Sequence, residues 1–431
     1  MNMNNPIEID RNNISIDKFY RKPLTPMELY SLGISFDNFH VVETLEDLKK
    51  NPTNIIVAEC KKSVLFTQNR SRTQQLVKRM NYVMNAGVYG QLHYEPSTRT
   101  EVLKPAQLQF KKIYKPYFGQ DLTNKTLLVF RQGGIGDLLF IKPNLDYLKE
   151  KYPSCTIKIA CGPQYQPMVT EWECIDEMID LPFTVDHIFR SNYQIVFEGV
   201  IERCKEAEST CSYHLFSKWM GLNLPDDLLI PKQDPNEKSV ETCLKHLEEI
   251  NIKPKDFIIV QMRASSTIRT PGKNVWKNLI TKLIEKGHNI IFTDSPQKSA
   301  DIDKFISTLN LSEEDNKKVK NYSSYSNLIS DTIALTSLSK LAIGTDSSLV
   351  HIAESLGIKS FAIMGPFPGK VRLSTYKNND WIDVNSKSNC GPCFIHSQKP
   401  CSNSSSEGES LCYNNLDYDL CLEKIERLLN K

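Results

Sequence analysis

Apolar segments typical of buried strands alternate with helical segments from residue 126 onward. The strand-like segments are TLLVF (126–130), TIKIACG (156–162), YQIVFEG (193–199), FIIVQM (257–262) and NIIFTD (289–294). Strands that alternate with helices in this way are typical of parallel sheets covered by helices. The sequence therefore predicts an α/β protein built on parallel sheets.

The alternation is interrupted by DDLLIPKQDPNEKS at residues 226–239, whose prolines and charges are typical of a linker. We therefore predict two Rossmann-like α/β/α domains, at residues 121–230 and 238–431, that face each other across a cleft. Ligands of such sheets bind beyond the carboxyl ends of the strands. A chain of 431 residues leaves room for a third unit, and we expect residues 1–120 to form an N-terminal α/β extension.

The composition argues against a membrane-spanning protein. Lys and Arg number 53 against 51 Asp and Glu, and no apolar run reaches the roughly 18 residues that a membrane helix needs. The first residues, MNMNNPIEID, lack the basic and apolar regions of a secretory signal. We expect a cytoplasmic protein, and peripheral contact with a membrane is left open.

Basic residues are concentrated in the N-terminal extension. Residues 61–120 contain 11 Lys and Arg against 2 Asp and Glu. Aromatic residues lie among them, namely Phe66, Tyr82, Tyr89, Tyr94, Phe110 and Tyr114. Basic and aromatic side chains together suit a polyanion. A solvated basic face, or a face that docks on the rest of the protein, has the same composition, and both interpretations stay open.

A glycine-rich turn, RQGGIGD at residues 131–137, follows the first strand and precedes a helix. Gly133, Gly134 and Gly136 allow a tight turn and close approach of a ligand to the backbone, and the helix offers free N–H groups to an anion. The turn has neither the GxGxxG spacing of dinucleotide-binding folds nor the GK[ST] ending of a P-loop, which disfavours a dehydrogenase and an NTPase. Asp137 is either a helix cap or a functional carboxylate.

A second strand–turn–helix–strand unit, KLAIGTDSSLVHIAESLGIKSFAIMGP, spans residues 340–366. Asp346, Ser347 and Ser348 stand at the start of its helix, and His351 lies one turn further on the same side. Hydroxyls, amides and an imidazole therefore converge, which suits a diphosphate. The alternative is that Asp346 or Ser347 only caps the helix and His351 is a core histidine.

A third segment, MRASSTIRTPGKNVW at residues 262–276, supplies Arg263, Arg269 and Lys273 beyond the strand FIIVQM. Cations at the end of a strand can neutralise a phosphate. Solvated loop charges would give the same pattern. This segment therefore supports a phosphate site only in combination with the two turns.

Most of the 12 cysteines are scattered, but five cluster near the C-terminus. Cys390 and Cys393 form a CxxC, followed by Cys401, Cys412 and Cys421. Four thiolates can form a structural zinc site, here at Cys390, Cys393, Cys401 and Cys412. Buried or redox-active thiols are the alternative.

Taken together, these motifs resemble the bacterial heptosyltransferase family, glycosyltransferase family 9. The family's first turn appears as GGIGDLL followed by KPNLDYLKEKYP, and its second as GTDSSLVHIAESLG followed by SFAIMGP. Its cysteine-rich tail is similar to CGPCFIHSQKPC and LCYNNLDYDLCLEKI. The resemblance covers residues 126–431, and the paired order of the turns is more specific than either turn alone.

The resemblance implies a GT-B fold and an inverting transferase that uses a nucleotide-diphosphate sugar without a catalytic metal. On this pattern Asp137 takes the position of the catalytic base, and Asp346 and His351 take donor-binding positions. The sequence departs from the family at Ser348, where the family has a glycine. The family's lysine before a Trp-Pro pair is also missing, and its counterpart is Arg269 or Lys273.

The acceptor is left open because residues 1–120 have no family counterpart. A saccharide, such as a lipopolysaccharide-type glycan, follows from the resemblance, and we expect residues 1–120 to select it. A hydroxylated base in DNA would suit the basic segment. A non-catalytic module that binds sugar nucleotides is a further alternative, although the presence of Asp137 argues against it.

Overall fold

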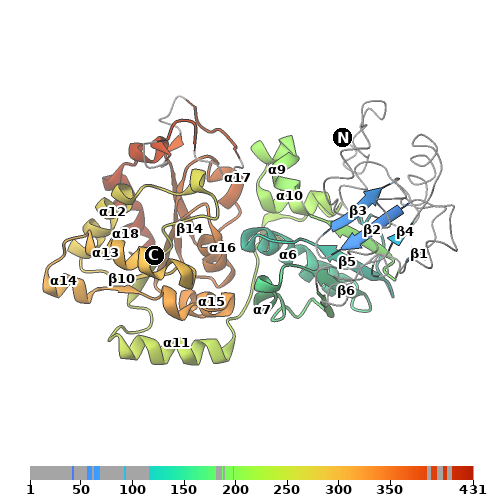
Figure 1. The fold of residues 1–431 in the computed structure, drawn as a ribbon, viewed down its shortest axis with the longest axis horizontal. Coiled ribbons are helices and arrows are strands. Elements are labelled where there is room, and N and C mark those ends of the chain that lie inside the picture. The colour runs from blue at the N-terminus through green and yellow to red at the C-terminus, as the bar shows by residue number, and fades with distance from the viewer. Residues whose placement is uncertain are drawn as a thin grey trace.

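The computed structural model describes residues 116–180, 187, 190–197, 199–385, 390–395, 401–404 and 410–430, and four short strands before residue 94. Figure 1 shows two lobes side by side, each built on a parallel sheet. We call residues 116–229 the first lobe and residues 237–430 the second lobe. The predicted pair of parallel sheets is confirmed.

The first lobe contains a four-stranded sheet in the order β7-β6-β5-β8, parallel throughout. Its central strand β5 is buried at four of five residues, as its apolar sequence predicts. The strands are β5 (Thr126–Phe130), β6 (Thr156–Ala160), β7 (Glu177–Ile179) and β8 (Tyr193–Val196). The helices are α6 (Ile135–Lys151), α7 (Gln166–Val169), α9 (Val200–Arg203) and α10 (Ser212–Trp219).

The second lobe contains a six-stranded parallel sheet in the order β11-β10-β9-β12-β13-β14. Its strands are β9 (Phe257–Val260), β10 (Asn289–Phe292), β11 (Val319–Asn321), β12 (Leu341–Thr345), β13 (Ser360–Met364) and β14 (Asn379–Asp383). Its helices are α11 (Glu237–Glu249), α12 (Lys273–Glu285), α13 (Ser299–Ser307), α14 (Glu313–Lys317), α15 (Ile329–Ser337), α16 (Ser348–Ser355), α17 (Lys370–Leu373) and α18 (Tyr418–Asn430). Within the described part of the chain, every helix is too short or too polar to cross a membrane.

The four strands before residue 94 form an antiparallel sheet in the order β1-β4-β2-β3. They are β1 (Val41–Val42), β2 (Ile56–Cys60), β3 (Ser63–Thr67) and β4 (Leu92–His93), and Figure 1 shows them at the end of the first lobe that is farther from the second. The basic cluster of Lys61, Lys62, Arg70, Arg72, Lys78 and Arg79 lies outside the described residues. Its role in acceptor selection stays a prediction.

The lobes meet through an apolar interface. The largest hydrophobic core includes Leu138 and Phe216 of the first lobe as well as Val350 and Met364 of the second. Helix α6 packs against α16, and α10 packs against α17. These contacts bring the two strand-to-helix turns that the sequence singled out to the same place.

Candidate active site

The two lobes enclose a cleft of about 720 Å³, which we call the front cleft. Its lining includes the segments that follow β5, β9 and β12, so it contains residues of all three sequence motifs. These segments follow the carboxyl ends of parallel strands, where open α/β sheets bind ligands.

Two glycines of the turn, Gly134 and Gly136, leave no room for a side chain. Gly134 caps α6 with φ of +91°, and a Cβ at this position would collide with the carboxylate of Asp137. A Cβ on Gly136 would lie 2.8 Å from Cδ2 of His351. The first motif therefore touches the second directly, lobe against lobe. Gly133 packs against a tyrosine ring instead and is not part of the cleft lining.

Asp137 lies in the first turn of α6 and lines the front cleft. Nη2 of Arg131 donates to its Oδ2 over 2.6 Å, and both side chains are largely buried, with exposed fractions of 6% and 18%. Arg131 also donates to the carbonyls of Gly133 and Phe197 over 2.7 and 2.9 Å. The guanidinium is therefore fixed, and it holds the Asp137 carboxylate in one orientation.

The N-terminus of α16 faces the same cleft. Ser347 is the N-cap residue, yet its side chain makes no capping bond. Its Oγ is buried and has no hydrogen-bond partner in the described part of the chain. Ser348 Oγ and the Leu349 amide both approach Oε1 of Gln261 over 3.4 Å, at the long limit of a hydrogen bond. This helix end is therefore suited to an anion.

Asp346 holds two arginines at the cleft. It is 3% exposed, and its Oδ2 lies 3.2 Å from Nη1 of Arg269 while its Oδ1 lies 3.8 Å from Nε of Arg372. Burial alone would raise the pKa of Asp346, but Arg269 and Arg372 outweigh burial, and its pKa lies below the usual value. The carboxylate therefore stays ionised and positions both guanidinium groups.

His351 is neutral at physiological pH. It is 4% exposed, and burial lowers its pKa to about 4 although the Asp346 carboxylate acts in the opposite direction. Its Nδ1 lies 2.5 Å from the hydroxyl of Tyr376. A neutral imidazole with one nitrogen occupied can offer the other to a ligand.

The remaining predicted cations lie in different surroundings. Arg263 lines the cleft and pairs with Asp294 and Asp301 over 3.0 and 3.1 Å, while its Nη2 is buried without a partner in the described part of the chain. Lys273 is exposed at the start of α12 and is not part of the cleft lining. Of the two candidates for the family's lysine, Arg269 is therefore the one at the cleft.

Sequence reasoning missed Arg131, Arg372 and Tyr376. Arg131 directly follows β5 and stands beside the glycine turn, which was a usable signal. Arg372 lies in α17, a helix of four residues, and is 4% exposed. No local pattern marked it, because its partners Asp346 and Ser212 are distant in the chain.

A match to a known family supports this interpretation of the sequence motifs. Residues 212–403 match the family model described as glycosyltransferase family 9 (heptosyltransferase). This part of the chain is therefore similar to family 9 glycosyltransferases. The matched region contains Arg269, Asp346 and His351, whereas Asp137 lies before it.

Solved structures of glycosyltransferases share the fold. ADP-heptose lipopolysaccharide heptosyltransferase II of Escherichia coli gives a TM-score of 0.54 at 14% identity, over 71% of this chain and 98% of that one. A family 9 glycosyltransferase from Veillonella parvula gives 0.55 at 12% identity, over 72% and 98%. A search of curated proteins gives no match. The predicted GT-B fold is confirmed.

The four cysteines predicted to bind zinc come together in the second lobe. Cys390, Cys393, Cys401 and Cys412 line one cavity of about 20 Å³. Burial and the neighbouring thiols raise the pKa of Cys412 to about 11. Even so, the described residues contain no group of three or more His, Cys, Asp or Glu side chains placed to hold a metal ion. The zinc site therefore stays a prediction.

One similar structure bears on this point. The glycosyltransferase TibC of enterotoxigenic E. coli is described as iron-containing and dodecameric, with a TM-score of 0.50 at 12% identity over 73% of this chain and 77% of that one. This similarity shows the shared fold. The absence of a catalytic metal, which the family resemblance implies, also stays a prediction.

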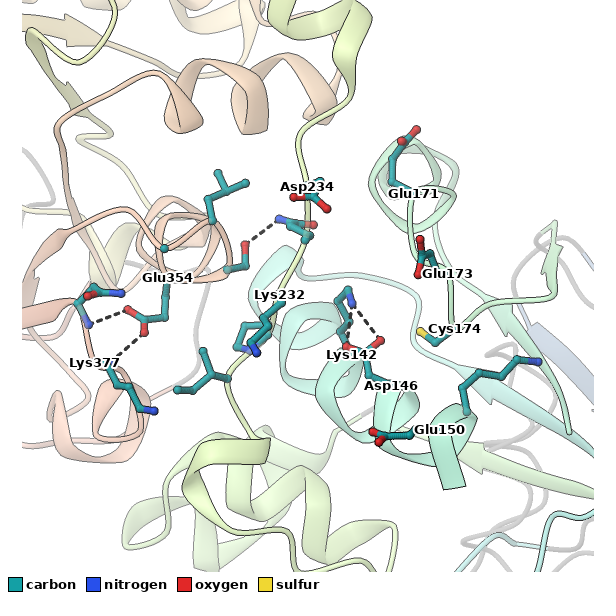
Figure 2. Close-up of a pocket in the computed structure, with 18 residues that line it drawn as sticks. Lys142, Asp146, Glu150, Glu171, Glu173, Cys174, Lys232, Asp234, Glu354 and Lys377 are labelled. Atoms are coloured by element: carbon teal, nitrogen blue, oxygen red, sulfur yellow. Dashed lines mark hydrogen bonds and ion pairs between the residues drawn. The ribbon is translucent and has the colours of Figure 1, made fainter. Parts of the chain in front are cut away.

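A second cavity, of about 950 Å³, lies between the lobes; we call it the rear cavity. Figure 2 shows α6 with Lys142, Asp146 and Glu150 on one side, Glu354 and Lys377 on the other, and the linker between them. Six acidic and four basic residues line it. Although it is the larger of the two, it contains none of the predicted site residues, and the front cleft is the candidate active site.

Proposed function

We propose that the protein is an inverting glycosyltransferase that moves a sugar from a nucleotide-diphosphate donor to an acceptor hydroxyl in the front cleft. The observation that carries this proposal is that Asp137 and the N-terminus of α16 line one cleft from opposite lobes. A base on one side and an anion site on the other fit a displacement in which acceptor and leaving group lie on opposite faces of the anomeric carbon.

In this mechanism Asp137 is the general base. Its ionised carboxylate accepts the proton of the acceptor hydroxyl as the oxygen attacks the anomeric carbon. The bond from that carbon to the diphosphate oxygen breaks, and the configuration at the carbon is inverted. Arg131 orients the carboxylate through the 2.6 Å ion pair.

The second lobe stabilises the departing diphosphate. The amides at the start of α16, Ser347 Oγ and the guanidinium of Arg269 all border the cleft. Arg372 adds a second positive charge that Asp346 holds in place. Preorganised donors of this kind contribute a few kcal/mol each where negative charge develops.

The acceptor is proposed to be a saccharide, in line with the family 9 domain. Hydroxylated DNA is the alternative, because residues 61–120 are strongly basic. The two acceptors differ in salt dependence. Binding of DNA falls steeply as salt rises from 50 to 200 mM, by about 10³- to 10⁵-fold for six to ten phosphate contacts, whereas a neutral saccharide shows little change.

A thermal-shift screen of nucleotide sugars tests the proposal first. A donor present at 100 times its dissociation constant adds about 2.7 kcal/mol of stability. Release of the nucleoside diphosphate is then followed with water or a saccharide as acceptor. A protein that binds a nucleotide sugar tightly but never releases the diphosphate, with any acceptor offered, is the non-catalytic module instead.

A further inference from the structure

Four aromatic rings from the two lobes pack together beside the front cleft. Phe140 and Tyr213 belong to the first lobe, with ring centroids 4.6 Å apart. His351 and Tyr376 belong to the second, 5.8 Å apart. Phe140 packs edge-on against His351 at 5.0 Å, and Tyr213 packs against Tyr376 at 5.5 Å. The cluster thus links the donor-binding histidine to a residue of the opposite lobe.

Three polar atoms of this cluster form a chain of hydrogen bonds. The hydroxyls of Tyr213 and Tyr376 lie 2.8 Å apart, and the Tyr376 hydroxyl lies 2.5 Å from Nδ1 of His351. All three side chains are buried. Burial raises the pKa of both phenols well above the usual value, so each hydroxyl keeps its proton.

The direction of the chain follows from counting its protons. In the described part of the chain, neither hydroxyl has a further hydrogen-bond partner. If Nδ1 of His351 carried a proton, the chain would contain three protons, on Nδ1 and on the two hydroxyls, but only two hydrogen bonds. One buried hydroxyl proton would then have no acceptor. Such an unpaired group is costly. Every hydroxyl proton is used only if Tyr213 donates to Tyr376 and Tyr376 donates to Nδ1.

This direction determines which nitrogen of His351 carries the imidazole proton. Because Nδ1 accepts a hydrogen bond in a neutral ring, the proton resides on Nε2. Nε2 lies on the side of the glycine turn, since a Cβ on Gly136 would be 3.2 Å away from it. No residue in the described part of the chain accepts a hydrogen bond from Nε2, and His351 lines the front cleft. The N–H group is therefore available to a ligand.

We propose that Tyr213 and Tyr376 are positioning residues whose hydroxyl relay fixes His351 as the Nε2–H tautomer. His351 then donates a hydrogen bond to an oxygen of the donor diphosphate. Because Tyr213 belongs to the first lobe, contact between the lobes strengthens donor binding in the second. This inference rests on the proposed function for the identity of the ligand, but the tautomer is a property of the free protein.

The tautomer is measured by NMR on the full chain labelled with ¹⁵N-histidine, because ring nitrogens with and without a proton have distinct shifts. His351→Gln identifies the signals of His351 among the 8 histidines. The relay predicts a proton on Nε2 in the parent, and a mixture of tautomers in Tyr376→Phe, where Nδ1 has lost its donor. A parent protein with the proton on Nδ1 would overturn the proposal.

Donor binding is measured by calorimetry with the nucleotide sugar that the thermal-shift screen selects. We expect about 10-fold weaker binding in Tyr376→Phe, which removes both hydrogen bonds of the relay, and about 3-fold weaker binding in Tyr213→Phe, which removes one. Tyr322→Phe is the matched control. It removes a tyrosine hydroxyl 3.0 Å from Nδ1 of His246, away from the front cleft, and should leave affinity within 2-fold.

The outcomes separate the relay from the proposed function. Unchanged tautomer and unchanged affinity in both relay variants would show that the rings only pack the interface. If Tyr376→Phe does not fold, Tyr213→Phe decides through donor affinity: weaker binding supports the relay, and parental affinity overturns it. If the parent binds no nucleotide sugar, the proposed function fails, while the tautomer in the free protein still supports or overturns the relay.

Discussion

The front cleft and the rear cavity are both formed between the same two lobes, yet they differ in how their polar groups are satisfied. In the rear cavity, Lys142 pairs with Asp146 over 2.8 Å, and Glu354 accepts hydrogen bonds from the amides of Lys377 and Asn378. In the front cleft, Ser347 Oγ and Arg263 Nη2 are buried without partners in the described part of the chain. Among the described residues, none that lines the rear cavity has a buried polar side-chain atom without a hydrogen-bond partner.

This difference distinguishes a binding site from a gap between domains. Buried polar groups are normally hydrogen-bonded, and the exceptions require an explanation. In the front cleft the unpartnered groups are donors, and they lie beside arginines and a helix N-terminus, so an anionic ligand satisfies them together. Volume alone would have selected the rear cavity, at about 950 Å³ against 720 Å³.

The largest expected effect is on catalysis by Asp137→Asn. Loss of the general base should lower release of nucleoside diphosphate by about 100- to 10,000-fold, with donor affinity close to that of the parent. Glu150→Gln is the control in the rear cavity, where this acid is exposed. It should retain parental turnover. Equal losses in the two variants would remove the distinction between the cavities.

Removal of an arginine from the front cleft should weaken donor binding. Arg269→Ala is expected to raise the dissociation constant about 10- to 100-fold, because hydrogen bonds to charged groups contribute about 1.5–3 kcal/mol. Lys232→Ala removes an exposed cation from the rear cavity. Calorimetry should show no change for that variant, and the reverse order of effects would place the donor in the rear cavity.

The two cavities should also respond oppositely to acid. The pKa of His351 is lowered to about 4 in the folded protein, so the unfolded chain takes up its proton first as the pH falls. Between pH 7 and 5 this costs about 2 kcal/mol of folding stability. Burial raises the pKa of Glu354, so the folded state takes up that proton first and gains stability as the pH falls.

Urea unfolding at pH 7 and pH 5 measures this difference. His351→Gln should lose less stability on acidification than the parent, and Glu354→Gln should lose more. If both substitutions change the pH dependence in the same direction, the assignment of a neutral buried histidine to the front cleft is wrong.

The cysteine cavity should have the smallest effect on transfer, because its residues do not line either cavity between the lobes. Elemental analysis of the purified chain should find one bound zinc ion that is absent from Cys393→Ser. Chelation should then lower thermal stability while diphosphate release stays within 2-fold when assayed below the new melting temperature. If the parent protein contains no zinc, the predicted zinc site is wrong and these residues are free cysteines.

Much of this arrangement follows from local sequence patterns. The strands β5, β6, β8, β9, β10, β12 and β13 were predictable because each is a short apolar run, and the turns at Asp137 and Asp346 were predictable because each follows such a strand and precedes a helix. The edge strands β7, β11 and β14 were not predicted, because each is short or contains charged residues. The sequence did not reveal Arg372, because its role depends on burial between segments far apart in the chain. The Tyr213–Tyr376 contact likewise joins residues separated by 163 positions.

We propose that the donor binds in the front cleft with its diphosphate at the N-terminus of α16. A crystal structure of the full chain with the nucleoside diphosphate of the selected donor tests it most directly. We expect phosphate oxygens within hydrogen-bonding distance of the Ser347 hydroxyl and the Arg269 guanidinium, with Asp137 facing the sugar position. A nucleotide bound in the rear cavity, or bound in the front cleft with its phosphates away from α16, would contradict it.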